Sequence, residues 1–316
     1  MKIVALGGGT GLSTLLRGVK LFPDLEVTAV VTVTDEGGSS GVIREELSVL
    51  PPGDLRNNIV ALAEDESLMS KIMAYRFTEG QTFKDHSLGN LIIAALTKIT
   101  GSFATAIERI SSILAIEGKV LPVTEDFVRL IAKMENGEEV VGEAEIAKRR
   151  SHISEIRLNS SAHPFPKVLE ALKSCDAVIL GPGSLFTSII PNLLVDGVNE
   201  SMKNKPKILI ANIMTQPGET FGFSLKEHIT TVEKYLGCFL DRVIANSEKI
   251  PMEVLKRYAT QGSEPVFSDG RDDRVFTFPM VSIVVDPRDG KKKIRHDPMK
   301  LAASVHEILM NLVGER

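Results

Sequence analysis

Two carboxylates and a run of small residues stand next to each other at residues 35–41 of this 316-residue chain. Asp35 and Glu36 follow the stretch VTVT, whose alternation is typical of a strand, and GGSSG comes directly after them. Backbone N–H groups of small loops bind anions, whereas carboxylates repel anions and bind hydroxyl groups or cations. Residues 35–41 therefore predict a ligand that has an anionic part together with sugar hydroxyls or a divalent cation.

Asp35 has two candidate roles. A carboxylate at the tip of the second strand of a dinucleotide-binding fold commonly accepts hydrogen bonds from a ribose diol. The same carboxylate could instead be a metal ligand that holds Mg²⁺ against phosphate oxygens. An exposed turn pair without a ligand is the third interpretation of Asp35 and Glu36. The sequence leaves these alternatives open and indicates no other cofactor.

A second glycine-rich stretch, GGGTGLS at residues 7–13, opens a helix directly after a strand. Glycine lets a phosphate approach the backbone, and the free N–H groups and dipole of a helix start favour negative charge. Gly9, Thr10 and Gly11 are therefore predicted to contact a diphosphate, with a tight ligand-free turn as the alternative. Leu12 stands where the fingerprint G-x-G-x-x-G needs glycine, which disfavours an NAD-dependent oxidoreductase.

Further candidate ligand contacts follow the other predicted strands or precede apolar helices, and most have small, hydroxyl or amide side chains. They are Gly38, Ser39, Ser40, Asp54, Asn57, Asn58, His86, Gly89, Asn90, Gly183, Ser184, Thr187, Asn212, Thr215 and Asn246. Asp54 is alternatively an ordinary N-cap. Tyr258 could stack on a base or merely pack its helix. Arg295 is the member of the basic hairpin tip 288–295 expected to point inward. No catalytic residue is assigned, except Asp35 if the protein is a transferase.

Short apolar β stretches alternate with helical patterns and predict an α/β, Rossmann-like, doubly wound and mainly parallel sheet. Strands are predicted at 2–6, 26–33, 176–182, 205–214, 241–247 and 281–286, and helices at 12–21, within 55–114, and at 167–175, 224–237, 251–261 and 298–312. Residues about 118–160 are predicted to form a small β-rich insertion, with a hairpin turn at 135–137, in a single domain spanning 1–316. Ligands of such sheets bind beyond the carboxyl ends of the strands, where the candidate residues gather.

The composition of the chain limits the classes of partner that we expect for it. A net charge of −4 argues against binding to nucleic acid, and no apolar run reaches the roughly 18 residues of a membrane span. The first residues lack the features of a signal peptide. Cys175 and Cys238 lie in apolar segments and are expected to be buried thiols in a cytoplasmic protein. A homo-oligomer is compatible with the sequence, which does not define the oligomeric state or any protein partner.

Six motifs together resemble a known family. GGGTGLSTLLRG, TVTDEGGSSG, PPGDLRNN, HSLGN, LGPGSLFTSIIPNLLV and NIMTQPGET occur in this order along nearly the whole chain. They resemble the bacterial gluconeogenesis-factor family, the YvcK-like branch of the CofD-like superfamily, whose namesake is 2-phospho-L-lactate transferase. The resemblance implies a Rossmann-like cytoplasmic protein that binds a UDP-sugar and is needed for cell shape and growth on gluconeogenic carbon sources. The branch often has two aspartates where this chain has Asp35 and Glu36.

Two functions follow from these residues and from the resemblance. The first is a regulatory protein that binds a nucleotide-diphosphate sugar without turnover. The second is a Mg²⁺-dependent transferase that moves a phospholactyl-type group from a guanosine-diphosphate donor to a deazaflavin precursor. An aromatic content of 5%, the absence of tryptophan and the lack of an evident acid–base pair favour the binding protein.

Overall fold

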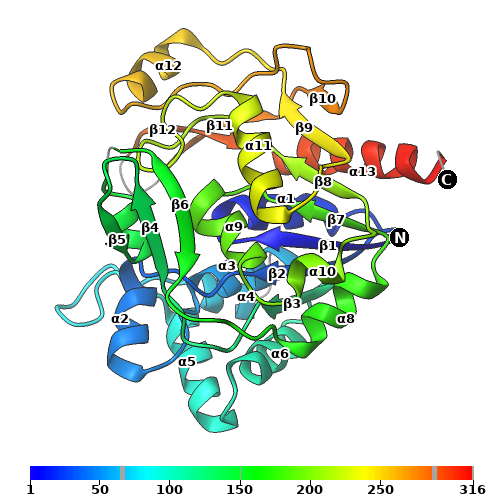
Figure 1. The fold of residues 1–316 in the computed structure, drawn as a ribbon. Coiled ribbons are helices and arrows are strands. Elements are labelled where there is room, and N and C mark those ends of the chain that lie inside the picture. The colour runs from blue at the N-terminus through cyan, green and yellow to red at the C-terminus, as the bar shows by residue number, and fades with distance from the viewer. Residues whose placement is uncertain (65–67, 150, 287–289, 315–316) are drawn as a thin grey trace.

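A computed structural model describes residues 1–64, 68–149, 151–286 and 290–314 of the chain (Figure 1). Arg288 and Asp289 of the predicted basic hairpin tip lie outside the described residues. Among the helices described, none is both long enough and apolar enough to cross a membrane.

The central sheet has seven strands in the described part of the chain, in the order β10-β9-β8-β7-β1-β2-β3. They are β1 (Lys2–Gly7), β2 (Glu26–Val31), β3 (Lys119–Pro122), β7 (Ala177–Leu180), β8 (Lys207–Ile210), β9 (Arg242–Asn246) and β10 (Val275–Phe278). Neighbouring strands are parallel throughout, and the direction of progression reverses between β1 and β7. The predicted Rossmann-like, mainly parallel sheet is confirmed. The junction of β1 and β7 is its topological switch point.

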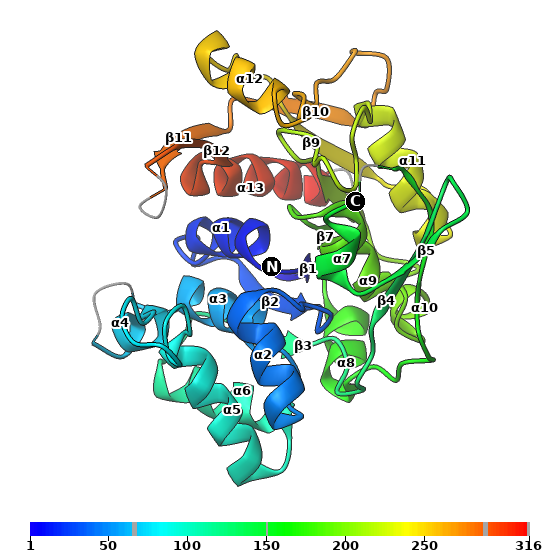
Figure 2. The ribbon, with the colours of Figure 1, turned by 90° about the vertical axis from the view of Figure 1, so that its left-hand side faces the viewer.

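Helices cover both faces of this sheet. Figure 2 shows α1 (Thr10–Val19), α3 (Gly53–Leu62) and α13 (Pro298–Gly314) on one side, and α8 (Pro166–Ser174), α9 (Ile190–Leu193) and α11 (Leu225–Leu236) on the other. The remaining helices are α2 (Gly38–Leu47), α4 (Leu68–Ala74), α5 (Leu88–Thr100), α6 (Phe103–Ile113), α7 (Glu143–Ile146), α10 (Val198–Ser201), α12 (Met252–Ala259) and the π-helix η1 (Leu185–Ile189). In α1, Leu12, Leu15, Leu16 and Val19 recur at helical spacing and are all fully buried. This apolar stripe fixes the start of α1 at the switch point.

Two small antiparallel sheets flank the main one. Strands β4 (Leu130–Met134), β5 (Glu139–Val141) and β6 (Ile153–Leu158) pair in the order β5-β4-β6, and β11 (Val281–Val285) pairs with β12 (Lys292–His296). The predicted turn at 135–137 does join β4 to β5. The predicted insertion at 118–160 starts too early, however, because β3 pairs with β2 and buries Val120 and Leu121 in the main sheet. The predicted strand at 281–286 is likewise part of a hairpin, and the main sheet instead ends with β10.

The GGSSG stretch was predicted as a loop, but residues 38–47 form helix α2. Glycine and serine are poor helix formers, so local propensity hides this helix. Burial of Ser39, Ser40 and Ile43 holds it instead. Gly38 has a φ of 45°, a conformation that glycine adopts without strain. Asp35 therefore lies in the short connection between β2 and α2, four residues beyond the end of the strand.

Candidate functional site

A groove of about 450 Å³ lies at the carboxyl ends of β1, β7 and β8, at the switch point of the sheet. We call it the polar groove. Of the predicted ligand contacts, the following line it: Gly9, Thr10, Gly11, Asp54, Gly183, Ser184, Asn212, Thr215, Tyr258 and Arg295. Segments far apart in the sequence thus meet here as expected, although a ligand role for these residues stays a prediction. Arg295, which was expected to point inward, lines the groove while its side chain stays exposed.

Helix α1 opens the polar groove. Its N-cap is Gly9, whose position leaves the helix start without a side-chain cap, so the first N–H groups have no intrahelical partner. A Cβ atom on Gly9 would lie 2.3 Å from Oδ1 of Asp54, and one on Gly11 would lie 2.3 Å from the backbone oxygen of Pro182. Gly11 has an ordinary helical backbone. Glycine is therefore required at residue 11 for close packing of two loops and not for a positive φ.

The loops after β7 and β8 are locked to each other by side chains. Asn212 accepts a hydrogen bond from the N–H of Gly183 (3.3 Å) and donates one to the oxygen of Gly183 (2.7 Å). Gln216 Nε2 donates to Ser184 Oγ (2.7 Å). Thr215 Oγ1 accepts from the N–H of Glu264 (2.8 Å). These contacts form a rigid hydroxyl- and amide-rich wall opposite the start of α1.

Two carboxyl groups, Asp54 and Glu143, lie in the polar groove with raised pKa values. Burial, followed by the negative charge of Asp35, raises the pKa of Asp54 to about 8. Burial, followed by the charges of Asp35 and Asp54, raises the pKa of Glu143 to about 9. These shifts favour the protonated form of both groups, in which a carboxyl can donate a hydrogen bond and does not repel an anion.

Asp54 was also considered as the N-cap of the helix that follows it. The N-cap of α3 is Pro52, and Asp54 is the second residue of the helix. The helix therefore starts at residue 53, two residues earlier than a capping role for Asp54 would require. The backbone N–H of Gly9 donates a hydrogen bond to the Asp54 carboxyl group, which faces the groove.

The second predicted group of ligand contacts lies outside the groove, at the starts of α2, α3 and α5. Its predicted members are Gly38, Ser39, Ser40, Asn57, His86, Gly89 and Asn90, and we call them, together with the unpredicted Arg56 and Ser87, the helix-start cluster. Ser39 Oγ lies 3.3 Å from His86 Nδ1, and it accepts hydrogen bonds from the N–H of Ser87 (3.3 Å) and from Asn90 (3.4 Å). Asp35 lies close to both this cluster and the groove. A Cβ atom on Gly53 would lie 2.2 Å from Ser40 Oγ, in the cluster, and 2.9 Å from Asp35 Oδ2. The charge of Asp35 in turn contributes to the raised pKa of Asp54 in the groove.

Three other predicted ligand contacts make hydrogen bonds within the protein, and a ligand role for them stays a prediction. Asn58 is fully buried and donates to the oxygens of Gly8 (2.8 Å) and Asp54 (2.7 Å), which holds the first glycine loop in place. Thr187 is buried and donates to Glu219 (2.9 Å). Asn246 accepts hydrogen bonds from the backbone N–H groups of residues 248 and 280. The polar groove is lined by none of these side chains. A position at the end of a strand therefore does not distinguish side chains that stabilise a loop from side chains that line the groove.

Several groove residues had no assignment from the sequence: Thr14, Glu143, Ser188, Gln216, Gln261 and His296. Thr14 follows Thr10 by one helical turn, and this spacing places both side chains on the same face of α1, which could have indicated that Thr14 lines the groove. Glu143 comes from α7, at the end of the small β5-β4-β6 sheet, and no local pattern indicates its position. Glu36 lies nearby but serves the fold, since it pairs with Arg129 at 2.6 Å and its N–H contacts Glu143 Oε2 at 3.2 Å.

The residues of the site do not by themselves form a cation site. Across the described ranges there is no group of three or more histidine, cysteine, aspartate or glutamate side chains that could hold a metal ion. Asp35 Oδ1 accepts a hydrogen bond from the N–H of Gly37 (2.8 Å), and burial raises the pKa values of the other two acids nearby. A metal role for Asp35 stays a prediction without a supporting ligand set.

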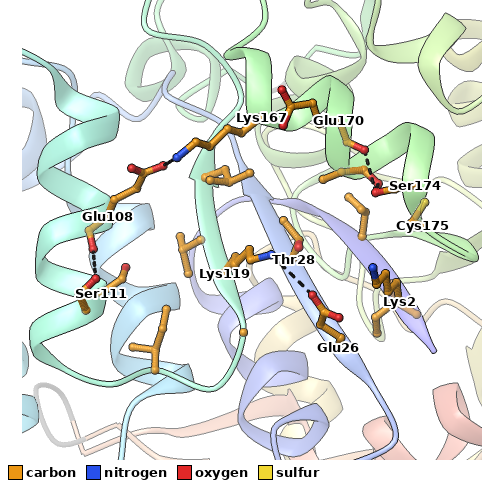
Figure 3. A pocket seen from close by; sticks show the side chains of 18 of the residues that line it. Lys2, Glu26, Thr28, Glu108, Ser111, Lys119, Lys167, Glu170, Ser174 and Cys175 are labelled. Carbon is orange, nitrogen blue, oxygen red and sulfur yellow. Dashed lines mark hydrogen bonds and ion pairs between the residues drawn. The ribbon is translucent and has the colours of Figure 1, made fainter.

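A larger cavity of about 650 Å³ lies near the opposite edge of the sheet, over the first residues of β1, β2 and β3 (Figure 3). Figure 3 shows Lys167 of α8 and Glu108 of α6 reaching toward each other across it. Lys119 pairs with Glu26 at 3.5 Å. Four of the charged side chains that line this cavity thus form ion pairs. The cavity also lies away from the carboxyl ends of the strands, where parallel sheets bind ligands.

Cys175 is buried and Cys238 is half-buried, and both thiols are free. Burial raises the pKa of the Cys175 thiol. Neither residue lines the polar groove, and the raised pKa makes Cys175 a poor nucleophile. The prediction of buried, unpaired thiols is confirmed for Cys175.

Comparison with known proteins extends the motif evidence. A family model described as "2-phospho-L-lactate transferase CofD" matches residues 3–283 of the chain. A Thermotoga maritima protein named "Putative gluconeogenesis factor" is 54% identical over 312 residues, which is 98% of this chain and 99% of that protein. A Bacillus subtilis protein named "Gluconeogenesis factor" is 41% identical over 314 residues, with 98% of both chains covered. A crystal structure of a Bacillus halodurans protein superposes with a TM-score of 0.89 at 39% identity, covering 96% of this chain and 99% of the other. The resemblance inferred from the six motifs is confirmed.

Proposed function

Because the chain belongs to the CofD family, we propose that it is a regulatory protein that binds a nucleotide-diphosphate sugar, a UDP-sugar in particular, without turning it over. The diphosphate would lie at the start of α1 between Gly9–Gly11 and Gly183–Ser184. The proposed physiological role, as a gluconeogenesis factor, comes from the names of the relatives. A need for the protein in maintaining cell shape is the part that comes from the motif resemblance alone.

One observation carries the binding proposal: the start of α1, which has no side-chain cap, faces a wall of hydroxyl and amide groups. Burial raises the pKa values of the acids beside it, which favours their uncharged forms. Helix starts of this kind bind phosphate groups through free N–H donors. Protonated Asp54 and Glu143 would donate hydrogen bonds to sugar hydroxyls or phosphate oxygens. An elongated polar ligand with an anionic centre fits this arrangement.

Substitution of Thr10 tests the proposal, because Thr10 is exposed at the first position of α1. In Thr10→Asp, the negative charge at the start of α1 should stabilise the helix through its dipole but repel a diphosphate. We expect UDP-glucose affinity, measured by calorimetry, to fall about tenfold or more, which is ~1.4 kcal/mol. Thr10→Asn has nearly the same shape without the charge and should bind within about threefold of the natural protein. Equal binding by both variants, with unchanged melting temperature, would remove the diphosphate from the start of α1.

A second candidate function, a phospholactyl-type transferase, is favoured by a specific feature of the site. The sequence indicated no acid–base pair, yet Asp54 and Glu143 lie in one groove with pKa values raised to about 8 and about 9. Groups with such values exchange protons near neutral pH, as acid–base catalysis requires. Against transfer, Tyr258 is the one phenylalanine, tyrosine or tryptophan side chain lining the described groove, so a flat acceptor has little to stack on.

A further inference from the structure

The polar groove has a defined order of contacts from one end to the other. Asp54 touches the first glycine loop, and Gly11 packs on Pro182. The loop after β7 is bound to Asn212 and Gln216. Thr215 then accepts from the N–H of Glu264, and its backbone oxygen accepts from Ser263 (2.6 Å). Asp54 and the start of α1 therefore stand at one end of this series of contacts. Ser263, whose N–H donates to the backbone oxygen of Tyr258 (3.1 Å), stands at the other, and Gln261 and His296 also line the groove.

The end that contains His296 is built for a flat, polar group. Tyr258 is half-buried, and its hydroxyl accepts a hydrogen bond from the N–H of Ile294 (2.9 Å), which fixes the ring in the groove wall. Strand β12 places His296 opposite Val281 of β11. Gln261 adds an amide that can both donate and accept. A nucleobase is the part of a nucleotide that matches an aromatic ring with polar edges around it.

His296 presents a specific hydrogen-bonding atom at this end. Its imidazole donates a hydrogen bond to the backbone oxygen of Ala211, and Nε2 has no partner within the described chain. The hydrogen is therefore on Nδ1, and Nε2 carries a lone pair. Burial lowers the pKa of His296 to about 4, so the ring stays neutral at physiological pH. Buried acceptors without a partner are rare and commonly have a functional reason.

We propose that Nε2 of His296 reads the base of the bound nucleotide by accepting a hydrogen bond from a ring N–H. Uracil offers such a donor at N3, whereas cytosine has a lone pair there that would face the lone pair of Nε2. The base thus lies between Tyr258 and His296, and the sugar lies at the end with Asp54 and Glu143. This inference rests on the proposed function and adds the orientation of the ligand and the residue that selects its base.

The test compares UDP with CDP, which differ only in the groups at base positions 3 and 4. We expect calorimetry on the natural protein to give UDP an affinity about tenfold higher than CDP, the effect of one hydrogen bond gained or lost. N3-methyl-UDP, which lacks the donor, should bind as weakly as CDP. His296→Leu keeps the bulk but removes the acceptor, so UDP affinity should fall about tenfold while CDP affinity changes less than about twofold.

His163→Leu is the matched control, since His163 is an exposed histidine outside the groove that pairs with Asp126. It should preserve the preference for UDP. Equal affinities of UDP, CDP and N3-methyl-UDP for the natural protein would overturn the inference, and that comparison does not depend on how His296→Leu folds. If UDP and UDP-glucose both fail to bind, the proposed function fails as well. If they bind without base preference, only the role of His296 fails.

Discussion

At the scale of single residues, burial raises the pKa values of Asp54 and Glu143, so we expect binding in the groove to depend on their protonation. Asp35 contributes to both raised pKa values, so the carboxylate that first suggested a site acts on its neighbours. Glycine positions are poorer probes of binding here. A side chain on Gly11 would collide with the backbone of Pro182, so a change at Gly11 would disturb packing and binding together. Substitutions that alter charge without changing shape separate the two effects.

Glu143→Gln should make the protein less sensitive to rising pH. A carboxyl whose pKa is raised in the folded state contributes stability at low pH, present below its unfolded value near 4.5, and this contribution is lost as pH rises through about 9. The variant has no proton to lose at residue 143. We therefore expect its melting temperature to exceed that of the natural protein by a few degrees at pH 8.5 and to match it at pH 5.

The same substitution should flatten the pH dependence of ligand binding. In the natural protein, ionisation of Asp54 and Glu143 places negative charge beside the diphosphate, so UDP-glucose affinity should fall about tenfold between roughly pH 7 and pH 9. Glu145→Gln on the same helix is the control, because Glu145 is exposed and pairs with Lys148. An equal fall in affinity for all three proteins would show that Glu143 does not govern the pH response.

At the scale of elements, the part of the site formed by adjacent strand ends was predictable and the part formed by distant segments was not. The glycine loop after β1 and the loops after β7 and β8 follow the rule for parallel sheets, so Gly9, Gly183 and Asn212 were placed correctly in one groove. Glu143 was missed because its position depends on how the small sheet packs. Helix α2 was missed because tertiary burial, not propensity, forms it.

The connection from β5 to α7 is a sensitive point for the whole acid group. Gly142 has a φ of 95°, and a Cβ there would lie 2.1 Å from Oε2 of Glu36, whose other carboxylate oxygen pairs with Arg129. Gly142→Ala should therefore cost about 1–3 kcal/mol of unfolding free energy in urea. It should also weaken the pH dependence of stability, because Glu143 follows directly. Gly137→Ala has a similar φ of 87° with nothing near its Cβ, so it should cost only the backbone strain. Equal losses for both variants would exclude the contact with Glu36.

At the scale of the whole molecule, the topology explains why binding and transfer are hard to separate in this family. The proposed diphosphate site at the switch point between β1 and β7 would serve either function, and helices cover both faces of the sheet that forms it (Figure 2). The two functions differ in the other groups that the groove offers. Here these include Asp54 and Glu143, whose pKa values are raised, and Tyr258 and His296. Turnover is therefore decided by whether a second substrate can bind beside the acids.

The turnover experiment supplies Mg²⁺, a guanosine-diphosphate-linked phospholactate and a deazaflavin precursor, and measures release of GMP. We expect none above background, because the groove has about 450 Å³ for donor and acceptor together and one tyrosine ring for stacking. UDP-glucose should instead bind saturably in the micromolar range, about −8 kcal/mol. Release of GMP that disappears in Asp35→Ala or Asp54→Asn would move the protein to the transferases. In that case the raised pKa of Asp54 would serve proton transfer to or from the acceptor hydroxyl. General acid–base catalysis contributes about 10²–10⁴-fold to the rate alone. The fold-loss of GMP release in Asp54→Asn should therefore exceed its fold-loss of UDP affinity.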